Sequence, residues 1–88
     1  MSSKHSMQKL VANQYGIKYA KEAYEYYKEM KLDIDWEDRA ERMTKMCLIC
    51  YRLDTGDQDE AHLKEVTEQA LSTWNYLWSS AQKLKTVS

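Results

Sequence analysis

Apolar side chains recur at every third or fourth position through the C-terminal third of the chain. The recurring positions are Leu63, Thr67, Ala70, Trp74, Leu77, Ala81 and Leu84. Val66 and Trp78 broaden this row, while charged and small polar residues fill most of the positions between. Such spacing is typical of an amphipathic helix with one long packing seam. The pattern predicts a helix over about residues 59–85, against which the rest of the chain packs.

Two further helices are predicted upstream of this one. In the first, over about residues 6–31, apolar side chains cover more than half of the helical circumference, so this helix has two surfaces to bury. The second covers about residues 36–53. Its inner row is Trp36, Ala40, Met43, Cys47 and Cys50, flanked by Met46, Tyr51 and Leu53.

Capping residues mark the ends of these segments. Asp35 is a good N-cap for the second helix, and Gly56 is a natural C-terminal stop. The cap of the third helix is open among Thr55, Asp57 and Asp59.

Gly16 lies inside the first predicted helix, where glycine costs about 1 kcal/mol relative to alanine. Three interpretations stay open. The glycine marks a kink, it allows another backbone or a ligand to approach closely, or it is simply tolerated near a frayed terminus.

The composition predicts one all-α domain spanning residues 1–88. The chain has no proline, no phenylalanine and only two glycines, and it is short enough for a single small core. The expected architecture is a three-helix protomer, an N-terminal helix plus a helical hairpin, assembled as a homo-oligomer. No apolar run approaches the roughly 20 residues that cross a bilayer, and the N-terminus lacks the apolar core of a signal peptide. A cytoplasmic protein without a membrane partner is therefore expected.

The net charge of −1 conceals an uneven distribution. Residues 1–21 contain four lysines and no acid, whereas residues 33–60 contain nine acids and four bases. Opposed charges of this kind suit contact between subunits. They argue against binding to duplex nucleic acid, which needs a broad basic face.

The candidate chemical groups do not indicate an enzyme. Cys47 and Cys50 lie late in a helix on its apolar row, where free thiols are ordinarily core residues. With His5 and His62 they match no zinc spacing, so neither metal nor cofactor is expected. His62 is expected to be solvated, and nothing in the sequence pairs a base with a nucleophile.

The tyrosines of the first helix indicate binding instead. Tyr15 and Tyr19 lie among Lys9, Lys18 and Lys21 in the acid-free segment. Because aromatic faces stack on bases and lysines hold phosphates, this stretch is a candidate site for a nucleotide-like anion. A plain solvated basic face is the alternative.

Two stretches resemble a family of small helical phage proteins that counteract CBASS, a bacterial immune system, by sequestering its cyclic oligonucleotide signals. One runs from Leu63 to Ala70 and on through Trp74-Asn75 to Ala81, and the other runs from Tyr15 to Lys21. The resemblance implies a homo-oligomer, a hexamer in the family, with ligand pockets between protomers. It also implies that Tyr15 stacks on a base while Lys18 and Lys21 hold phosphates, with His5 and Lys9 as further ligand contacts.

The function expected from the sequence is therefore sequestration, without degradation, of cyclic di- or trinucleotide immune signals. If the chain is phage-encoded, this takes place in the cytoplasm of the infected bacterium. The alternative is a small helical inhibitor or adaptor that occludes a host protein through its acidic block.

Overall fold

The computed structural model describes the backbone of residues 3–30 and 35–87 as three helices. These are α1 (Ser3–Met30), α2 (Trp36–Thr55) and α3 (Glu60–Val87). Among the described residues there is no strand, so the prediction of an all-α protein with three helices is confirmed. None of the helices, over the residues described, is long and apolar enough to cross a membrane.

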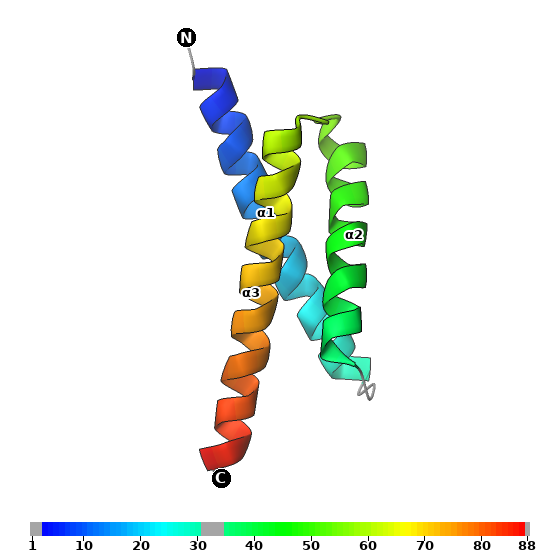
Figure 1. The fold of residues 1–88 in the computed structure, drawn as a ribbon, viewed down its shortest axis with the longest axis vertical. Coiled ribbons are helices and arrows are strands. Elements are labelled where there is room, and N and C mark those ends of the chain that lie inside the picture. Colours follow the sequence, from blue (N-terminus) through cyan, green and yellow to red (C-terminus); the bar gives the residue numbers. More distant parts are fainter. Residues whose placement is uncertain (1–2, 31–34, 88) are drawn as a thin grey trace.

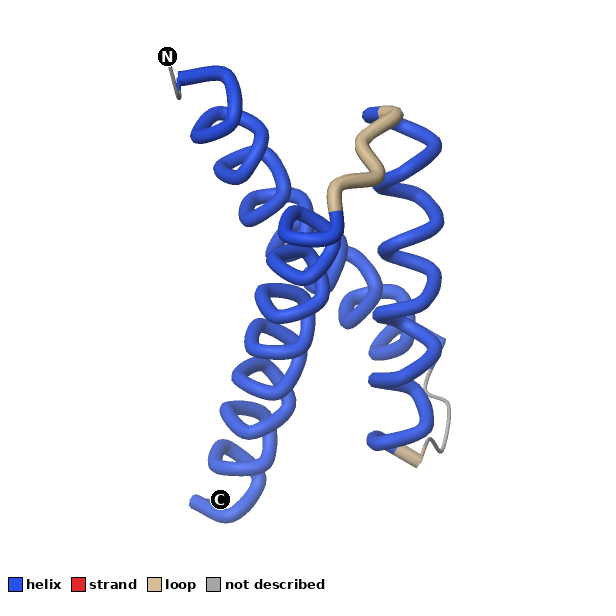
Figure 2. Tube along the Cα trace, turned by 45° about the horizontal axis from the view of Figure 1, so that its top comes forward, coloured by secondary structure: helices blue, strands red, loops and turns tan. Residues whose placement is uncertain are grey.

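The three helices form an elongated bundle with extents of 53 × 22 × 18 Å (Figure 1). α2 and α3 form the predicted hairpin, and α1 packs against both, most extensively against α3. Figures 1 and 2 show that the start of α1 and the end of α3 project in opposite directions beyond the body of the bundle. Each long helix therefore has one end that is covered by fewer neighbours.

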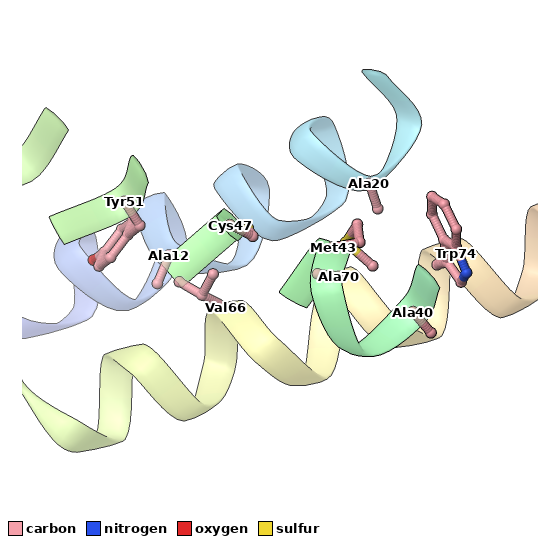
Figure 3. Packing of buried hydrophobic residues seen from close by; sticks show 9 residues of the cluster. All are labelled: Ala12, Ala20, Ala40, Met43, Cys47, Tyr51, Val66, Ala70 and Trp74. Carbon is pink, nitrogen blue, oxygen red and sulfur yellow. The ribbon is translucent and has the colours of Figure 1, made fainter. Parts of the chain in front are cut away.

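A stripe of small residues allows α1 and α3 to come close together. Ala12, Gly16 and Ala20, spaced four residues apart, are all buried on α1. They face the ridge of α3 that contains Val66 and Ala70, both with no exposed surface (Figure 3). Rows of four-residue spacing on two helices are the commonest way in which helices interlock.

At Gly16 the backbones of α1 and α3 lie too close together for a side chain to fit between them. A Cβ atom built at this position would lie only 2.5 Å from the carbonyl oxygen of Val66 and 3.1 Å from the backbone nitrogen of Ala70. Since α1 runs through Gly16 as one helix, close approach of another backbone is the interpretation that applies.

Aromatic rings fill the end of the core where α2 begins, away from the crossing at Gly16. The Trp36 ring stacks on Trp74 at a centroid distance of 4.3 Å and on Trp78 at 5.4 Å. Tyr24 and Tyr27 meet the Trp74 ring edge-on. Stacked and edge-to-face rings of this kind add to the stability that burial alone supplies. This cluster anchors the start of α2 to the middle of α3.

The helix ends follow the capping chemistry of the sequence. The Asp35 carboxylate accepts hydrogen bonds from the backbone N–H groups of Glu37 and Asp38, at 3.1 and 3.3 Å. Gly56 ends α2 with a left-handed φ of 73°, which favours glycine. Of the three candidates for the cap of α3, Asp59 is the one whose carboxylate accepts from Ala61 N–H, at 2.9 Å.

The buried face of α3 is rotated from the predicted seam. Its fully buried members are His62, Val66, Ala70 and Trp74, spaced every four residues. Leu63 and Thr67, from the predicted row, are only half-buried, and the side chain of Leu84 lies outside the described residues. The reason is the four-residue stripe of α1, which selects a four-residue ridge on its partner.

Candidate functional site

A groove between α1 and α2 is the candidate functional site. Its volume is about 530 Å³, within the range of about 300–1,000 Å³ that holds small ligands. α1 contributes Tyr19, Ala23 and Tyr27, while α2 contributes Arg39, Arg42, Met43, Lys45, Met46 and Ile49. The groove therefore combines two aromatic rings, an aliphatic and thioether wall, and three cations.

The three cations come from one face of α2. The Arg39 guanidinium lies over the Tyr27 ring, 5.2 Å from its centroid, in a cation–π contact. Arg42 and Lys45 pair along the helix with Asp38 and Glu41, at 3.4 and 3.2 Å. Both pairs are largely exposed, and exposed pairs contribute little, so these cations are able to exchange their partners for a bound anion.

Tyr19 forms an uncharged part of the groove wall. Burial raises the pKa of Tyr19 to about 12, and the neighbouring Cys50 thiol, which also takes part in a hydrogen bond with Tyr19, adds to this effect. Burial likewise raises the pKa of the Cys47 thiol to about 12. These groups stay protonated at neutral pH, so the positive charge on α2 is not offset by a phenolate or thiolate at these positions.

The sequence-predicted ligand residues are spread over other parts of α1. Tyr15 is half-buried, and its hydroxyl donates to the Asp54 carboxylate at 2.6 Å while its ring meets Tyr51 edge-on. Burial, followed by the Asp54 contact, raises the pKa of Tyr15. The Tyr15 ring is thus turned toward the end of α2.

Lys18 shares a hollow with Tyr15 and Tyr19, but Glu22 and Asp54 line the same hollow. A phosphate there would meet two carboxylates. Lys21 lies farther round the outer face of α1, and Lys9 is exposed near the start of the helix. The side chain of His5 lies outside the described residues.

A buried polar cluster holds the α2–α3 turn. His62 Nδ1 lies 2.7 Å from the Asp57 carboxylate, which also accepts a hydrogen bond from the Tyr51 hydroxyl at 2.6 Å. Burial acts to raise the pKa of Asp57, but the hydrogen bonds from Tyr51, the Asp59 backbone and His62 together lower it. The prediction of a solvated His62 is wrong, because only 1% of this side chain is exposed.

Sequence reasoning missed both the groove and this cluster. The groove had a readable signal, since Arg39, Arg42 and Lys45 recur every three residues beside an apolar row. The cluster of Tyr51, Asp57 and His62 was harder to predict from the sequence. Its three members come from the end of one helix, a turn and the start of the next helix, so no single periodic pattern contains them.

Within the described part of the chain, no group of three or more histidine, cysteine or acidic side chains is arranged to hold a metal ion. The fold is that of an all-α three-helix protein, with a groove lined by aromatic and cationic side chains. Comparisons with known protein families, with curated proteins and with solved structures found no match.

Proposed function

We propose that this chain binds and sequesters, without degrading it, a small anion that carries flat rings. The ligand class favoured by the resemblance of the sequence is a cyclic di- or trinucleotide, and its removal would counteract the CBASS defence of a bacterial host. The observation that carries this proposal is the groove between α1 and α2, which places two tyrosine rings beside three cations.

The chemistry of the groove matches the two parts of such a ligand. A nucleobase presents a flat π-surface that stacks on tyrosine or on a guanidinium plane, at roughly 1–3 kcal/mol per stacked base. Its phosphates are held by arginine through paired hydrogen bonds and by lysine as a point charge. The thioether and aliphatic wall formed by Met43, Met46 and Ile49 lets the groove adapt to ring shape.

Binding measurements with purified protein test this proposal. Titration calorimetry with a panel of cyclic di- and trinucleotides is expected to detect a complex, and chromatography of the recovered ligand is expected to show it intact. Arg39→Ala and Tyr27→Ala are expected to weaken binding at least about tenfold. Lys64→Ala is the matched control, since Lys64 is exposed on α3 and does not line the groove.

Three results would overturn the proposal: no nucleotide binds, the bound nucleotide is hydrolysed, or Lys64→Ala weakens binding as much as Arg39→Ala. If no nucleotide binds, the alternative function, a small helical inhibitor or adaptor that occludes a host protein, would be tested next. It predicts that charge reversal at Glu37, Asp38 and Glu41 abolishes capture of a host protein.

The site predicted from the sequence is tested in the same assay. Lys18→Ala and Lys21→Ala are expected to leave affinity within about twofold of the parent if the α1–α2 groove is the site. A large loss from these variants with none from Arg39→Ala would favour the outer face of α1 as the ligand site.

We further propose that the protein self-associates through the C-terminal half of α3. Residues 69–82 contain no charged side chain, and Tyr76 and Trp78 are exposed within this stretch. Depletion of charge and exposure of aromatic rings are typical of the core of protein interfaces. Native mass spectrometry is expected to detect an oligomer, and Tyr76→Glu is expected to dissociate it. A monomer in the parent protein would overturn this part of the proposal.

A further inference from the structure

Two surface patches of opposite charge lie next to each other on this protein. The first is the α1–α2 groove, which is lined by the three cations of α2. The second, called here the acidic face of α1, is a shallow hollow of about 400 Å³. It is lined by three acids, a tyrosine and a lysine: Glu22, Glu25, Glu29, Tyr26 and Lys21. The two patches adjoin, because the Tyr26 ring meets the Tyr27 ring of the groove edge-on at a centroid distance of 5.5 Å.

The charges of both patches are incompletely neutralised within one copy of the chain. Among the side chains that the structure describes, the three glutamates of the acidic face take part in no ion pair, and neither does Arg39. Arg42 and Lys45 have exposed partners on their own helix, and exposed ion pairs contribute little to stability. Each patch is therefore available to a partner of opposite charge.

Exposed apolar side chains accompany both sets of charges. Tyr26 exposes 59% of its surface beside the glutamates, while Met46 and Ile49 expose 50% and 46% at the groove. Tyrosine and methionine are enriched at protein interfaces, and a thioether packs readily on an aromatic ring. The acidic face and the groove thus complement each other in apolar surface as well as in charge.

We propose that two copies of the chain form a dimer in which the acidic face of α1 of each copy lies in the α1–α2 groove of the other. Because the patches adjoin, a two-fold axis lets each copy contribute both of them, so that every contact forms twice. Placing one face of a helix in a groove is a recurring mode of protein recognition. In this arrangement the glutamates of one copy meet Arg39 of the other, and Tyr26 packs against Met46 and Ile49.

The adjacency of the two patches selects a second copy over other large partners. An occupant that covers both patches has to present acids to the groove and cations to the acidic face. A uniformly anionic surface, such as a layer of lipid headgroups, satisfies the groove but is repelled by the three glutamates. A second copy related by a two-fold axis satisfies both patches.

The dimer competes with a nucleotide for the groove. Both occupants present anionic groups to the Arg39 guanidinium, so they exclude each other. A cyclic dinucleotide is therefore expected to separate the dimer into ligand-bound monomers. This competition rests on the proposed function, whereas dimer formation does not.

Sedimentation equilibrium of charge variants tests the dimer. The contact through α3 joins such dimers into larger oligomers, so Tyr76→Glu is expected to leave dimers and provides the background for the other substitutions. In that background, the groove variant Arg39→Glu/Arg42→Glu and the face variant Glu25→Lys/Glu29→Lys are each expected to raise the dissociation constant of the dimer at least about tenfold. Like charges then oppose each other across both contacts.

Mixing the groove variant with the face variant is the sharpest test. In a mixed dimer, one contact keeps the parent charges and the other has them exchanged, so both contacts are attractive. The mixture is therefore expected to dimerise although each variant alone does not. Lys64→Glu/Glu68→Lys is the matched control, because it reverses an exposed ion pair on α3 outside both patches. It is expected to dimerise like its background, with unchanged helicity by circular dichroism in all variants.

The proposal is overturned if Tyr76→Glu protein is monomeric, or if both charge variants dimerise as their background does. It is also overturned if only the groove variant dissociates, since another acidic segment then occupies the groove, or if the mixture stays monomeric. Nucleotide binding to an intact dimer likewise contradicts it. If no nucleotide binds, the mixed dimer still decides this proposal, because its formation requires no ligand.

Discussion

Replacing Gly16 by alanine tests the close crossing of α1 and α3. The position is helical, and alanine is favoured over glycine in a helix by about 1 kcal/mol. On secondary structure alone the substitution stabilises the protein. The crossing of α1 and α3 predicts the opposite, because the added methyl group points into the backbone of α3.

The size of the effect follows from the distances. The new Cβ would lie 2.5 Å from the carbonyl oxygen of Val66 and 3.2 Å from the Cβ of Gln69. Favourable contacts lie at about 3.5–4.0 Å, so α1 and α3 must separate by about 1 Å. Overpacking typically costs 1–3 kcal/mol, and the upper end applies because a backbone carbonyl cannot rotate away. After subtracting the helix-propensity gain, we expect a net loss of roughly 2 kcal/mol.

Urea unfolding followed by tryptophan fluorescence and circular dichroism measures this loss. For a domain of this size it corresponds to a fall in Tm of roughly 8–16 °C. Gln14→Ala and Gln14→Gly form the matched control pair, since Gln14 is exposed on the same helix and the pair isolates helix propensity. A Gly16→Ala protein about 1 kcal/mol more stable than the parent would refute the close crossing.

Three further predictions follow from the helix ends and buried groups. Asp35→Ala is expected to lower the free energy of unfolding by about 1 kcal/mol in urea titrations, because two backbone N–H groups lose their acceptor. Since the pKa of Asp57 is lowered in the folded protein, its contribution is present above the unfolded pKa of about 3.9 and is lost as pH falls through the folded pKa. The stability gap between the parent and Asp57→Asn, from urea titrations at several pH values, is therefore expected to narrow below about pH 4, and a constant gap would contradict this account. In thiol labelling at mild alkaline pH, Cys50 is expected to react before the fully buried Cys47, whose pKa is about 12, and equal rates in the folded protein would show that Cys47 is accessible.

Much of the secondary structure was readable from the sequence because its causes are local. Asp35 and Gly56 act within one turn of the helix end that they mark, so their roles needed no tertiary information. The apolar rows predicted three helices for the same reason. Which of Thr55, Asp57 and Asp59 caps α3 could not be predicted from the sequence, because all three have suitable side chains. In the structure Asp59 accepts the hydrogen bond from the helix, while the Asp57 carboxylate contacts His62.

The candidate site was less predictable because it depends on how the helices cross. The groove exists only where Tyr19 and Tyr27 of α1 come to lie beside the cations of α2. That placement follows from the close approach at Gly16, which the sequence left open among three interpretations. His62 was misjudged for a similar reason, since its burial depends on the turn geometry that brings Asp57 to its ring.

The pairing of α1 with α3 has a consequence for how this protein is made. The two helices that share the largest interface are α1 and α3, with all of α2 synthesised between them. Contacts between residues so far apart in sequence form late, and a growing chain has only its N-terminal part available to fold. On the ribosome, α1 emerges with its small-residue stripe and tyrosines exposed, and its main partner is missing until α3 has also been synthesised. Folding of this bundle is therefore expected to wait until α3 has left the ribosome, and a ribosome stalled within α3 would carry a chain unable to form its core.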